Sequence, residues 1–342
     1  MKTEDIKIKD MGKYRSVWMG IAMIWIVVYH SQLHLSNPVL LFVKKIGYGG
    51  VDIFLFAAGL GSYYSYLKDH SPLDYLRRRI IRLAPVYVPF ILVWLIVKLV
   101  FYEMSIFKII GNFFGIQGFS YVGGEFNWYL TVIIICYLLT PYLASFIEQN
   151  KMGKNVILIL FLLLISTVFW NDRRMIISIT RLPIYALGMI FAKYDKKTLT
   201  KKFIFYESIL FVCGSMSLYL AYQHASAYLW NYGLHWYPFI LMTPFVCHIV
   251  SLVSAFMTKN KVGNKFIALL AAVGNYSFEI YLVHIFLFEF VKVWISNNTT
   301  GNNNSIWLFA FIILIPCVML LRLISHLLIY IFGKLQRRNK NE

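Results

Sequence analysis

Charged residues are scarce in this chain of 342 residues: they make up 14% of the sequence, whereas soluble globular domains carry about 25%. Hydrophobic residues reach 59%. This composition excludes a soluble enzyme, a disordered chain and a fibrous repeat. Apolar runs of about 20 residues recur along the sequence, and runs of that length cross a lipid bilayer. The chain is therefore predicted to be an integral membrane protein.

Cysteine is rare as well, with four residues in the chain. The four cysteines all lie inside apolar runs, and no two of them form a Cys-x-x-Cys pair, which argues against a disulfide framework and a thiolate zinc site. Histidines and carboxylates do not occur at metal-ligand spacing, so no metal is expected. A Gly-x-Ser-x-Gly elbow, a Walker loop and a dinucleotide fingerprint are also missing. The common soluble catalytic motifs are thus excluded.

Ten apolar segments have the length and composition of membrane helices, because lipid offers no partner to bare backbone groups. These segments lie at residues 17–35, 46–67, 84–102, 127–147, 155–170, 177–192, 203–223, 235–257, 266–295 and 305–332. The predicted fold is an all-α polytopic membrane protein with about ten transmembrane helices. We expect one domain over 1–342, with a membrane core at 15–332 and cytoplasmic tails at 1–14 and 333–342. The longest connection, 103–126, is glycine-rich and predicted to be an outer lid or re-entrant stretch.

The net charge of +18 is unevenly distributed. With the N-terminus placed inside, 24 of the 33 lysines and arginines fall on inner segments and six on outer ones. This bias follows the positive-inside rule and predicts that both the N- and the C-terminus are cytoplasmic. The basic residues would then face anionic membrane lipid. Nucleic acid is not an expected partner, because no basic domain stands apart from the membrane. No pattern indicates an oligomeric state.

Ionisable side chains inside membrane segments are costly and usually mark function. His30 and His34 lie one helical turn apart in the first predicted segment, and Asp52 begins the second. If the two segments form a hairpin, Asp52 accepts a hydrogen bond from one ring nitrogen of His30. The carboxylate would then orient the imidazole as a base that removes a proton from a hydroxyl. A structural His–Asp pair without catalytic role fits the same spacing.

Four arginines lie within residues 77–82, immediately before the third predicted segment. Arginine forks bind phosphate in bidentate fashion, so a cluster at the cytoplasmic mouth fits the phosphates of a nucleotide-bearing donor. Arg78 and Arg82 are the favoured contacts, whereas Arg77 and Arg79 are expected to matter less. The alternative is that all four are ordinary basic residues flanking the inner end of a membrane helix.

Five motifs follow one another over residues 15 to about 290. They are GIAMIWIVVYHS at 20–31, GVDIF at 50–54 followed by Gly59, RRIIRLAPVY at 78–87, NWYL at 127–130 with Pro141, and GNYS at 274–277 leading to YLVH at 281–284. Each motif is loose by itself. Their order in a chain of about ten spans resembles the integral-membrane acyltransferase family three, the bacterial polysaccharide O-acyltransferases.

Two positions depart from the family pattern. The family usually has an arginine eleven residues before its essential histidine, and Met19 stands there in this chain. Arg15 lies one turn earlier on the same face and is expected to take that role. The family often has Ser-Gly in the second span, where this chain has Ala58 and Gly59. A serine nucleophile is therefore not required there.

The resemblance implies a multi-pass acyltransferase in the inner membrane of a bacterial cell. Its donor would be a cytoplasmic acyl-coenzyme A, usually acetyl-coenzyme A, and its acceptor a hydroxyl of a lipid-linked or surface glycan outside. His30 would be the general base or carry the acyl group briefly, and Asp52 would orient it. Expected donor contacts are Arg78, Arg82, Arg15 and Tyr87. Expected acceptor-side residues are His34, Trp128 and His284.

Two other classes of function remain open at this stage. A transporter or flippase that moves a glycan intermediate without chemistry would also use polar residues inside the spans and a basic cytoplasmic mouth. A membrane scaffold would need neither feature. Only the acyltransferase forms a new ester on the glycan, so transfer of a labelled acyl group separates it from the other two classes.

Overall fold

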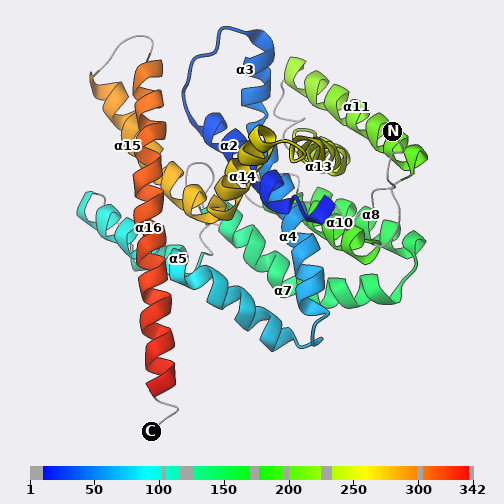
Figure 1. Cartoon of the computed structure of the whole chain (residues 1–342), viewed down its shortest axis with the longest axis horizontal. Coiled ribbons are helices and arrows are strands. Elements are labelled where there is room, and N and C mark those ends of the chain that lie inside the picture. The colour runs from blue at the N-terminus through cyan, green and yellow to red at the C-terminus, as the bar shows by residue number, and fades with distance from the viewer. Residues whose placement is uncertain are drawn as a thin grey trace.

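Every regular element in the described part of the chain is a helix, which confirms the predicted all-α fold (Figure 1). The computed structural model describes residues 11–101, 105–115, 127–169, 177–195, 200–224, 233–298 and 303–338. In chain order the elements are α2 (Arg15–His30), α3 (Pro38–Lys45), the 3₁₀ turn η1 (Gly47–Gly49), α4 (Gly50–Tyr66), α5 (Pro72–Phe101), α6 (Ile106–Phe113), α7 (Asn127–Gln149), α8 (Met152–Val168), α10 (Leu182–Lys193), α11 (Lys201–Gln223), α13 (Pro238–Met257), α14 (Lys261–Asn275), α15 (Ser277–Asn298) and α16 (Asn304–Arg338).

Five described helices are long and apolar enough to cross a membrane, namely α5, α7, α11, α13 and α16. α14 and α15 together make a sixth candidate span, bent by 68° at their junction. α2 and α8 are apolar but shorter. The described residues thus hold five or six candidate spans, whereas the sequence predicted about ten. The cytoplasmic location of the two termini stays a prediction.

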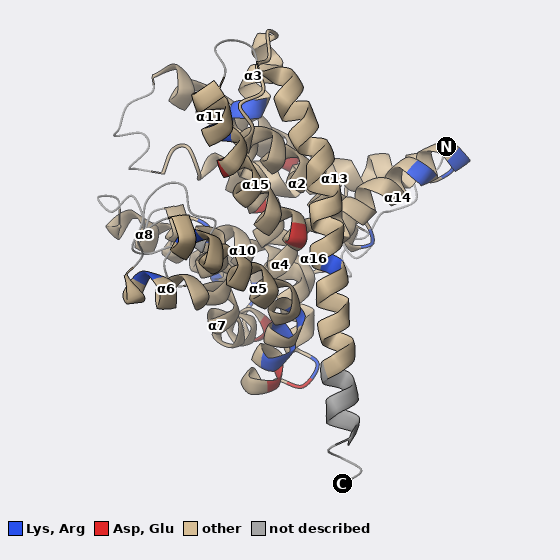
Figure 2. Ribbon diagram, turned by 90° about the vertical axis from the view of Figure 1, so that its left-hand side faces the viewer, with Lys and Arg blue, Asp and Glu red and all other residues tan. Residues whose placement is uncertain are grey.

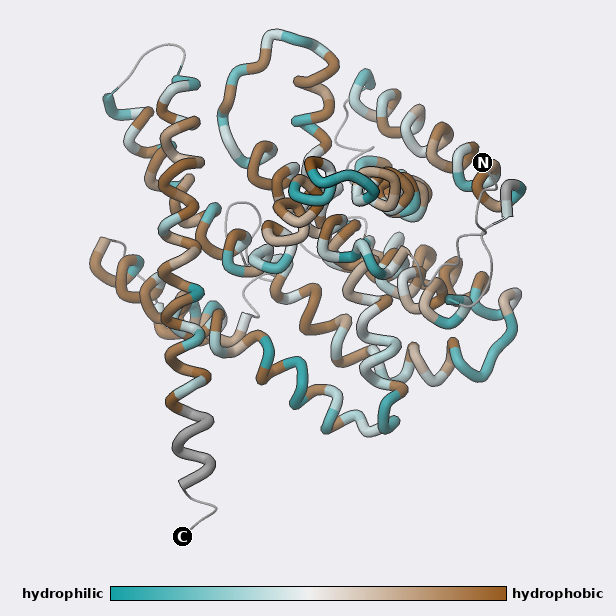
Figure 3. The backbone as a smooth tube through the Cα atoms, in the orientation of Figure 1, coloured by the Kyte–Doolittle hydropathy of each residue, from teal (hydrophilic) through white to brown (hydrophobic). Residues whose placement is uncertain are grey.

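The longest apolar helices lie at the periphery. In their most apolar stretches, 17–28% of the residues of α5, α11 and α16 are buried, against 50–56% for α7 and α13. Figure 3 shows hydrophobic residues along most of α16, and Figure 2 shows no charge along most of the helical ribbon, with basic segments on α6, near the N-terminus and where α5 begins. Apolar side chains exposed on this scale are suited to contact with lipid tails.

The centre of the bundle is built from short helices. α10 has 12 residues and therefore rises about 18 Å, well short of the roughly 30 Å of a hydrocarbon core. Most residues of α4 and α10 are buried inside the protein. Figure 1 shows α2 and α4 in the middle of the bundle, with α5, α11 and α16 around them. These short helices were predicted as spans because burial in protein and burial in lipid favour the same side chains.

The central helices approach one another backbone to backbone. A Cβ atom on Gly59 of α4 would overlap the carbonyl oxygen of Tyr185, and one on Gly188 of α10 would overlap that of Phe56. Small residues at such crossings let helices inside a membrane pack through their backbones. Gly59, which belongs to the second motif of the sequence, therefore fixes how closely α4 and α10 pack.

The first helix ends earlier than predicted. α2 ends at His30, and the extended backbone of Ser31 follows it. The next helix starts with Asn37, whose side chain accepts hydrogen bonds from two backbone amides, and with Pro38 at the first helical position. Asn37 and Pro38 thus begin a separate helix, α3, and residues 31–37 connect it to α2. The prediction that His30 and His34 lie one turn apart on one helix is therefore wrong.

The ninth predicted segment, 266–295, is two helices rather than one. α14 ends at Asn275, Tyr276 leaves the helix, and α15 begins at Ser277. Gly274 and Asn275 are weak helix formers, and Gly274 packs against the backbone of α2 at Ser16. The close contact and the low propensity together place the bend at this point.

The third predicted segment starts twelve residues earlier than expected. α5 begins at Pro72, so the arginine-rich stretch lies inside the helix rather than before it. Four arginines on a helix project about 100° apart per residue, and neighbours in sequence therefore face different surroundings. Of the connection 103–126, residues 106–113 form α6, while 116–126 lie outside the described residues.

Filling the α4–α10 contact is expected to destabilise the fold. Gly59→Ala and Gly188→Ala each force two backbones apart, and overpacking of this kind typically costs about 1–3 kcal/mol. Thermal unfolding of the purified protein in detergent measures the loss. Gly153→Ala is the matched control, because a methyl group there meets nothing within 4 Å. Equal melting temperatures for all three variants would contradict the proposed packing.

Candidate functional site

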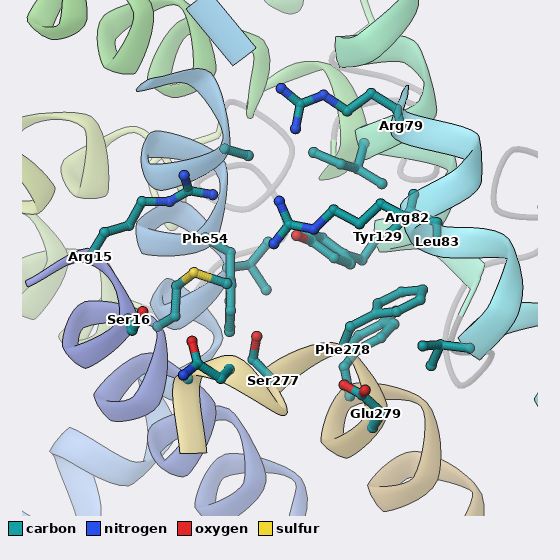
Figure 4. Close-up of a pocket in the computed structure, with 18 of the residues that line it drawn as sticks. Arg15, Ser16, Phe54, Arg79, Arg82, Leu83, Tyr129, Ser277, Phe278 and Glu279 are labelled. Atoms are coloured by element: carbon teal, nitrogen blue, oxygen red, sulfur yellow. The ribbon is translucent and has the colours of Figure 1, made fainter. Parts of the chain in front are cut away.

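A cavity of about 760 Å³ opens between α2, α4, α5, α7, the α14–α15 junction and α16. Three arginines line one part of it: Arg15 from α2, and Arg79 and Arg82 from α5. Figure 4 shows their guanidinium groups directed toward a common space. Arg79 and Arg82 are three residues apart and so share one face of α5. The guanidinium groups of Arg79 and Arg82 therefore lie on the side of α5 that faces Arg15.

Arg79 is held in place by the residues around it. Its Nη2 donates to the carbonyl oxygen of Gly61 at 3.1 Å. Its Cζ atom lies 4.9 Å from the ring centroid of Tyr75 and 5.3 Å from that of Tyr137. Arg79 is 9% exposed. A guanidinium fixed between two aromatic rings loses little conformational freedom when it binds an anion.

Arg78 does not line the cavity, although its neighbour Arg79 does, and its role as a donor contact stays a prediction. Its guanidinium forms two hydrogen bonds to the carboxylate of Asp69, at 2.5 and 3.2 Å, and one to the carbonyl oxygen of Ser65 at 2.8 Å. The side chain is 35% exposed and does not line the cavity. Because one residue along a helix turns a side chain by about 100°, Arg79 takes the position expected for Arg78.

Arg15 lines the same cavity as Met19, the residue at the position of the family arginine. The two residues are four apart in α2 and therefore lie on one face. Arg15 also passes next to the backbone of Gly61, where Arg79 is anchored. The position is consistent with Arg15 standing in for the missing arginine.

Two histidines meet at the C-terminal end of α2: His30 is the last residue of this helix, and His284 comes from α15. His284, from α15, is fully buried, and its Nε2 lies 3.4 Å from Nδ1 of His30. The Nδ1 of His284 lies 2.8 Å from the carbonyl oxygen of Ile280, and the Nδ1 of His30 lies 3.0 Å from that of Ile26. The structure thus brings together two histidines that are 254 residues apart in the sequence.

These contacts fix which ring nitrogens carry protons. A carbonyl oxygen only accepts, so neutral His284 carries its proton on Nδ1 and its Nε2 is an acceptor. Nδ1 of His30 then donates, either to His284 or to the carbonyl of Ile26. We therefore assign the lone pair of neutral His30 to its Nε2 atom, the nitrogen that is left to act as a base or nucleophile.

Asp52 does not orient His30, which corrects the prediction from the hairpin. Its carboxylate pairs with Nη1 of Arg181, and the two side chains are 1% and 0% exposed. The cation lies between the rings of Trp236 and Trp128, whose centroids are 4.7 and 5.9 Å from Cζ. A carboxylate buried in low dielectric needs a full countercharge, which a neutral imidazole does not supply.

The remaining predicted residues lie at separate places. The hydroxyl of Tyr87 donates to the backbone of Asn112 at 2.6 Å and so ties α5 to α6. Trp128 flanks Arg181 rather than the cavity. His34 lies in the connection after α2, where its backbone nitrogen and oxygen contact the side-chain amide of Asn304 at 2.7 and 2.9 Å. None of these three residues lines the arginine cavity.

Three arginines escaped the sequence analysis: Arg79 and Arg322, which line the cavity, and Arg181, the buried partner of Asp52. Arg79 looked like a flanking charge, and Arg181 was counted with the outer basic residues. Arg322 lay inside the predicted segment 305–332. A positive charge inside a membrane segment usually marks function, so this position could have identified Arg322 as a candidate.

Comparison with known proteins identifies one family. A family model described as an acyltransferase domain, acyltransferase family 3, matches residues 18–323. The match includes His30, His284, Arg79, Arg82 and Arg322, while Arg15 precedes it. No curated protein and no solved structure matches the chain.

Breaking the Asp52–Arg181 pair is expected to destabilise the protein. Asp52→Asn leaves a buried guanidinium without its countercharge, a change that typically costs about 3–5 kcal/mol. Replacing both partners by apolar residues, as in Asp52→Leu with Arg181→Met, is expected to restore much of that loss. Thermal unfolding in detergent compares the variants. An Asp52→Asn protein as stable as wild type would show that the pair is not a structural anchor.

Proposed function

This chain belongs to acyltransferase family 3, and we propose that it transfers an acyl group from a cytoplasmic acyl-coenzyme A to a hydroxyl of a cell-surface glycan. The family match and the apolar helices establish a membrane acyltransferase. Acetyl-coenzyme A is the proposed donor, a lipid-linked or surface glycan the proposed acceptor, and the inner membrane of a bacterium the proposed location.

The observation that carries the proposal is the arrangement of groups along α2. Arg15 and its cavity partners lie at the start of the helix, and His30 lies at its end, about 22 Å further at 1.5 Å per residue. The wall of the cavity extends to Ile26, whose carbonyl contacts His30. An acyl-coenzyme A has the same layout, with phosphates at one end of a long arm and the thioester at the other.

The positive charge of the cavity supports the proposal that it binds the phosphates of the donor. Arg15, Arg79 and Arg82 are three cations that form no ion pair with a carboxylate in the described part of the chain. Like charges gathered around a partly enclosed space repel one another and are relieved by an anion. Guanidinium forks match the oxygens of a diphosphate better than a point charge does.

The reaction itself needs one base. Nε2 of His30 takes the proton from the acceptor hydroxyl while the oxygen attacks the thioester carbonyl. The C–S bond then breaks, an ester forms, and the departing sulfur receives the proton from the imidazolium. In the alternative route Nε2 attacks the thioester carbonyl, the C–S bond breaks and coenzyme A leaves as the thiolate. The hydroxyl then attacks the acyl-imidazolium, the C–N bond breaks as the ester forms, and the hydroxyl proton passes to the thiolate. In both routes Nδ1 of His30 keeps its proton, which it donates to the carbonyl of Ile26 or to Nε2 of His284.

Acceptor recognition is proposed for the end of α2 that carries His30. His34 follows this end directly, and His284 borders it. Trp128 remains a candidate acceptor contact through its ring, since aromatic faces stack on sugar rings. A transporter would share the polar groups but not the need for a base with a free lone pair.

Removing the base is expected to abolish transfer. His30→Ala lacks Nε2, and loss of general-base catalysis alone lowers a rate roughly 10²- to 10⁴-fold. Single-turnover transfer from labelled acyl-coenzyme A in nanodiscs measures the effect. His34→Ala, which keeps the backbone contacts to Asn304, is expected only to reduce transfer. Near-wild-type turnover by well-folded His30→Ala protein would contradict the proposed role of His30 in the reaction.

The two neighbouring arginines provide a matched pair for the donor site. Arg79→Met and Arg82→Met are each expected to weaken coenzyme A binding by roughly 10- to 100-fold, the value of one charged hydrogen bond of about 1.5–3 kcal/mol. Arg78→Met removes an equal charge one residue away and is expected to leave binding unchanged. Calorimetric titration of the purified proteins checks this. The assignment fails if Arg78→Met weakens binding as strongly as the other two.

A further inference from the structure

Arg322 is a fourth arginine in the wall of the cavity, contributed by α16. Its partner Glu279 lies on α15, next to the α14–α15 bend. In Figure 4, Glu279 lies apart from the three guanidinium groups, with Phe278 drawn between them. The cavity therefore has a second charged region, distinct from the cluster around Arg15, Arg79 and Arg82.

The Arg322 guanidinium is held by one edge. Its Nη1 donates to Oε1 of Glu279 at 2.6 Å, and its Cζ lies 5.3 Å from the ring centroid of Tyr276. Glu279 is 2% exposed, whereas the Arg322 side chain is 36% exposed. Nε and Nη2 have no hydrogen-bond partner among the described residues. The buried glutamate thus orients a cation whose remaining donors are unused.

The charges in the cavity wall do not cancel. Four guanidinium groups face one carboxylate, which leaves three positive charges in excess. A diphosphate fits the cluster of three arginines. Coenzyme A carries a further phosphate on the 3′-oxygen of its ribose, and a phosphomonoester has about −1.5 to −2 charges at neutral pH. The ribose separates that group from the diphosphate, so it needs a cation of its own.

Resting on the proposed function, we propose that Arg322 binds the 3′-phosphate of the donor and that Glu279 positions it. Asn275 and Ser277 line the same region and supply an amide and a hydroxyl for the ribose or its phosphate. The cavity would then select a complete coenzyme A over donors that end in phosphopantetheine or lack the 3′-phosphate. A purely structural brace between α15 and α16 would use the same ion pair without this selectivity.

The test compares two ligands that differ by one phosphate. Coenzyme A and 3′-dephospho-coenzyme A are titrated against the purified full-length protein and its Arg322→Met and Arg82→Met variants. Wild type is expected to prefer coenzyme A by roughly 10- to 100-fold. Arg322→Met should lose that preference while binding the dephospho form as wild type does. Arg82→Met should weaken both ligands equally and keep the preference.

Binding of the dephospho form by Arg322→Met serves as the folding control. An unchanged preference in Arg322→Met would overturn the assignment, and so would equal binding of the two ligands by wild type. If Arg322→Met weakens the binding of both ligands equally, the Arg322–Glu279 pair is only a structural brace between α15 and α16. That result would also overturn the assignment of Arg322 to the 3′-phosphate. If wild type binds neither ligand, the proposed donor itself is wrong, a result distinct from loss of selectivity alone.

Discussion

The contact between α2 and α14 holds the α14–α15 junction against α2, and with it His284 and Glu279. Gly20 of α2 lies against the backbone of Leu270, and Gly274 of α14 against that of Ser16, so that the two helices pack without intervening side chains. α14 ends one residue after Gly274, and beyond Tyr276 the chain continues as α15, bent by 68°. The bend directs His284 to His30 and places Glu279 in the cavity wall. A Cβ atom at either glycine would overlap backbone atoms of the facing helix, so the two helices could not pack this closely.

The charges inside the bundle fall into two groups with different consequences. Asp52 and Arg181 neutralise each other in the core, as do Glu207 and His248 between α11 and α13 when the histidine is protonated. Such pairs offset the cost of burying a charge, because each charged group has an opposite partner inside the protein. The arginines of the cavity are not matched by carboxylates in the described residues apart from Glu279. Their excess charge is the physical reason to expect an anionic ligand.

Sequence reasoning reached the class of fold and the family because both depend on local patterns. Apolar runs identify membrane helices, and the ordered motifs from residue 20 to residue 284 identify the family that the comparison confirms. The short central helices were harder to interpret, because α4 and α10 are as apolar as helices in lipid. The burial of their side chains against other helices, not their composition, shows that protein surrounds them.

The site was predicted less completely, for two reasons. Arg78 and Arg79 are neighbours, and without the true start of α5 the sequence does not say which of them faces inward. The partner of Asp52 lies 129 residues away, so the nearest histidine was taken in its place. His284 was named from its motif, but its contact with His30 joins residues 254 apart, and no local pattern in the sequence indicates that pairing.

Transfer of a labelled acyl group tests the central claim most directly. Inverted membrane vesicles from cells that produce the protein retain the native glycan and expose the cytoplasmic face to added radiolabelled acetyl-coenzyme A. The account predicts alkali-labile label in the glycan fraction of vesicles with the wild-type protein and none in vesicles with His30→Ala at equal protein level. Equal labelling in both vesicles would contradict it, and so would wild-type vesicles that move glycan across the membrane without forming a labelled ester.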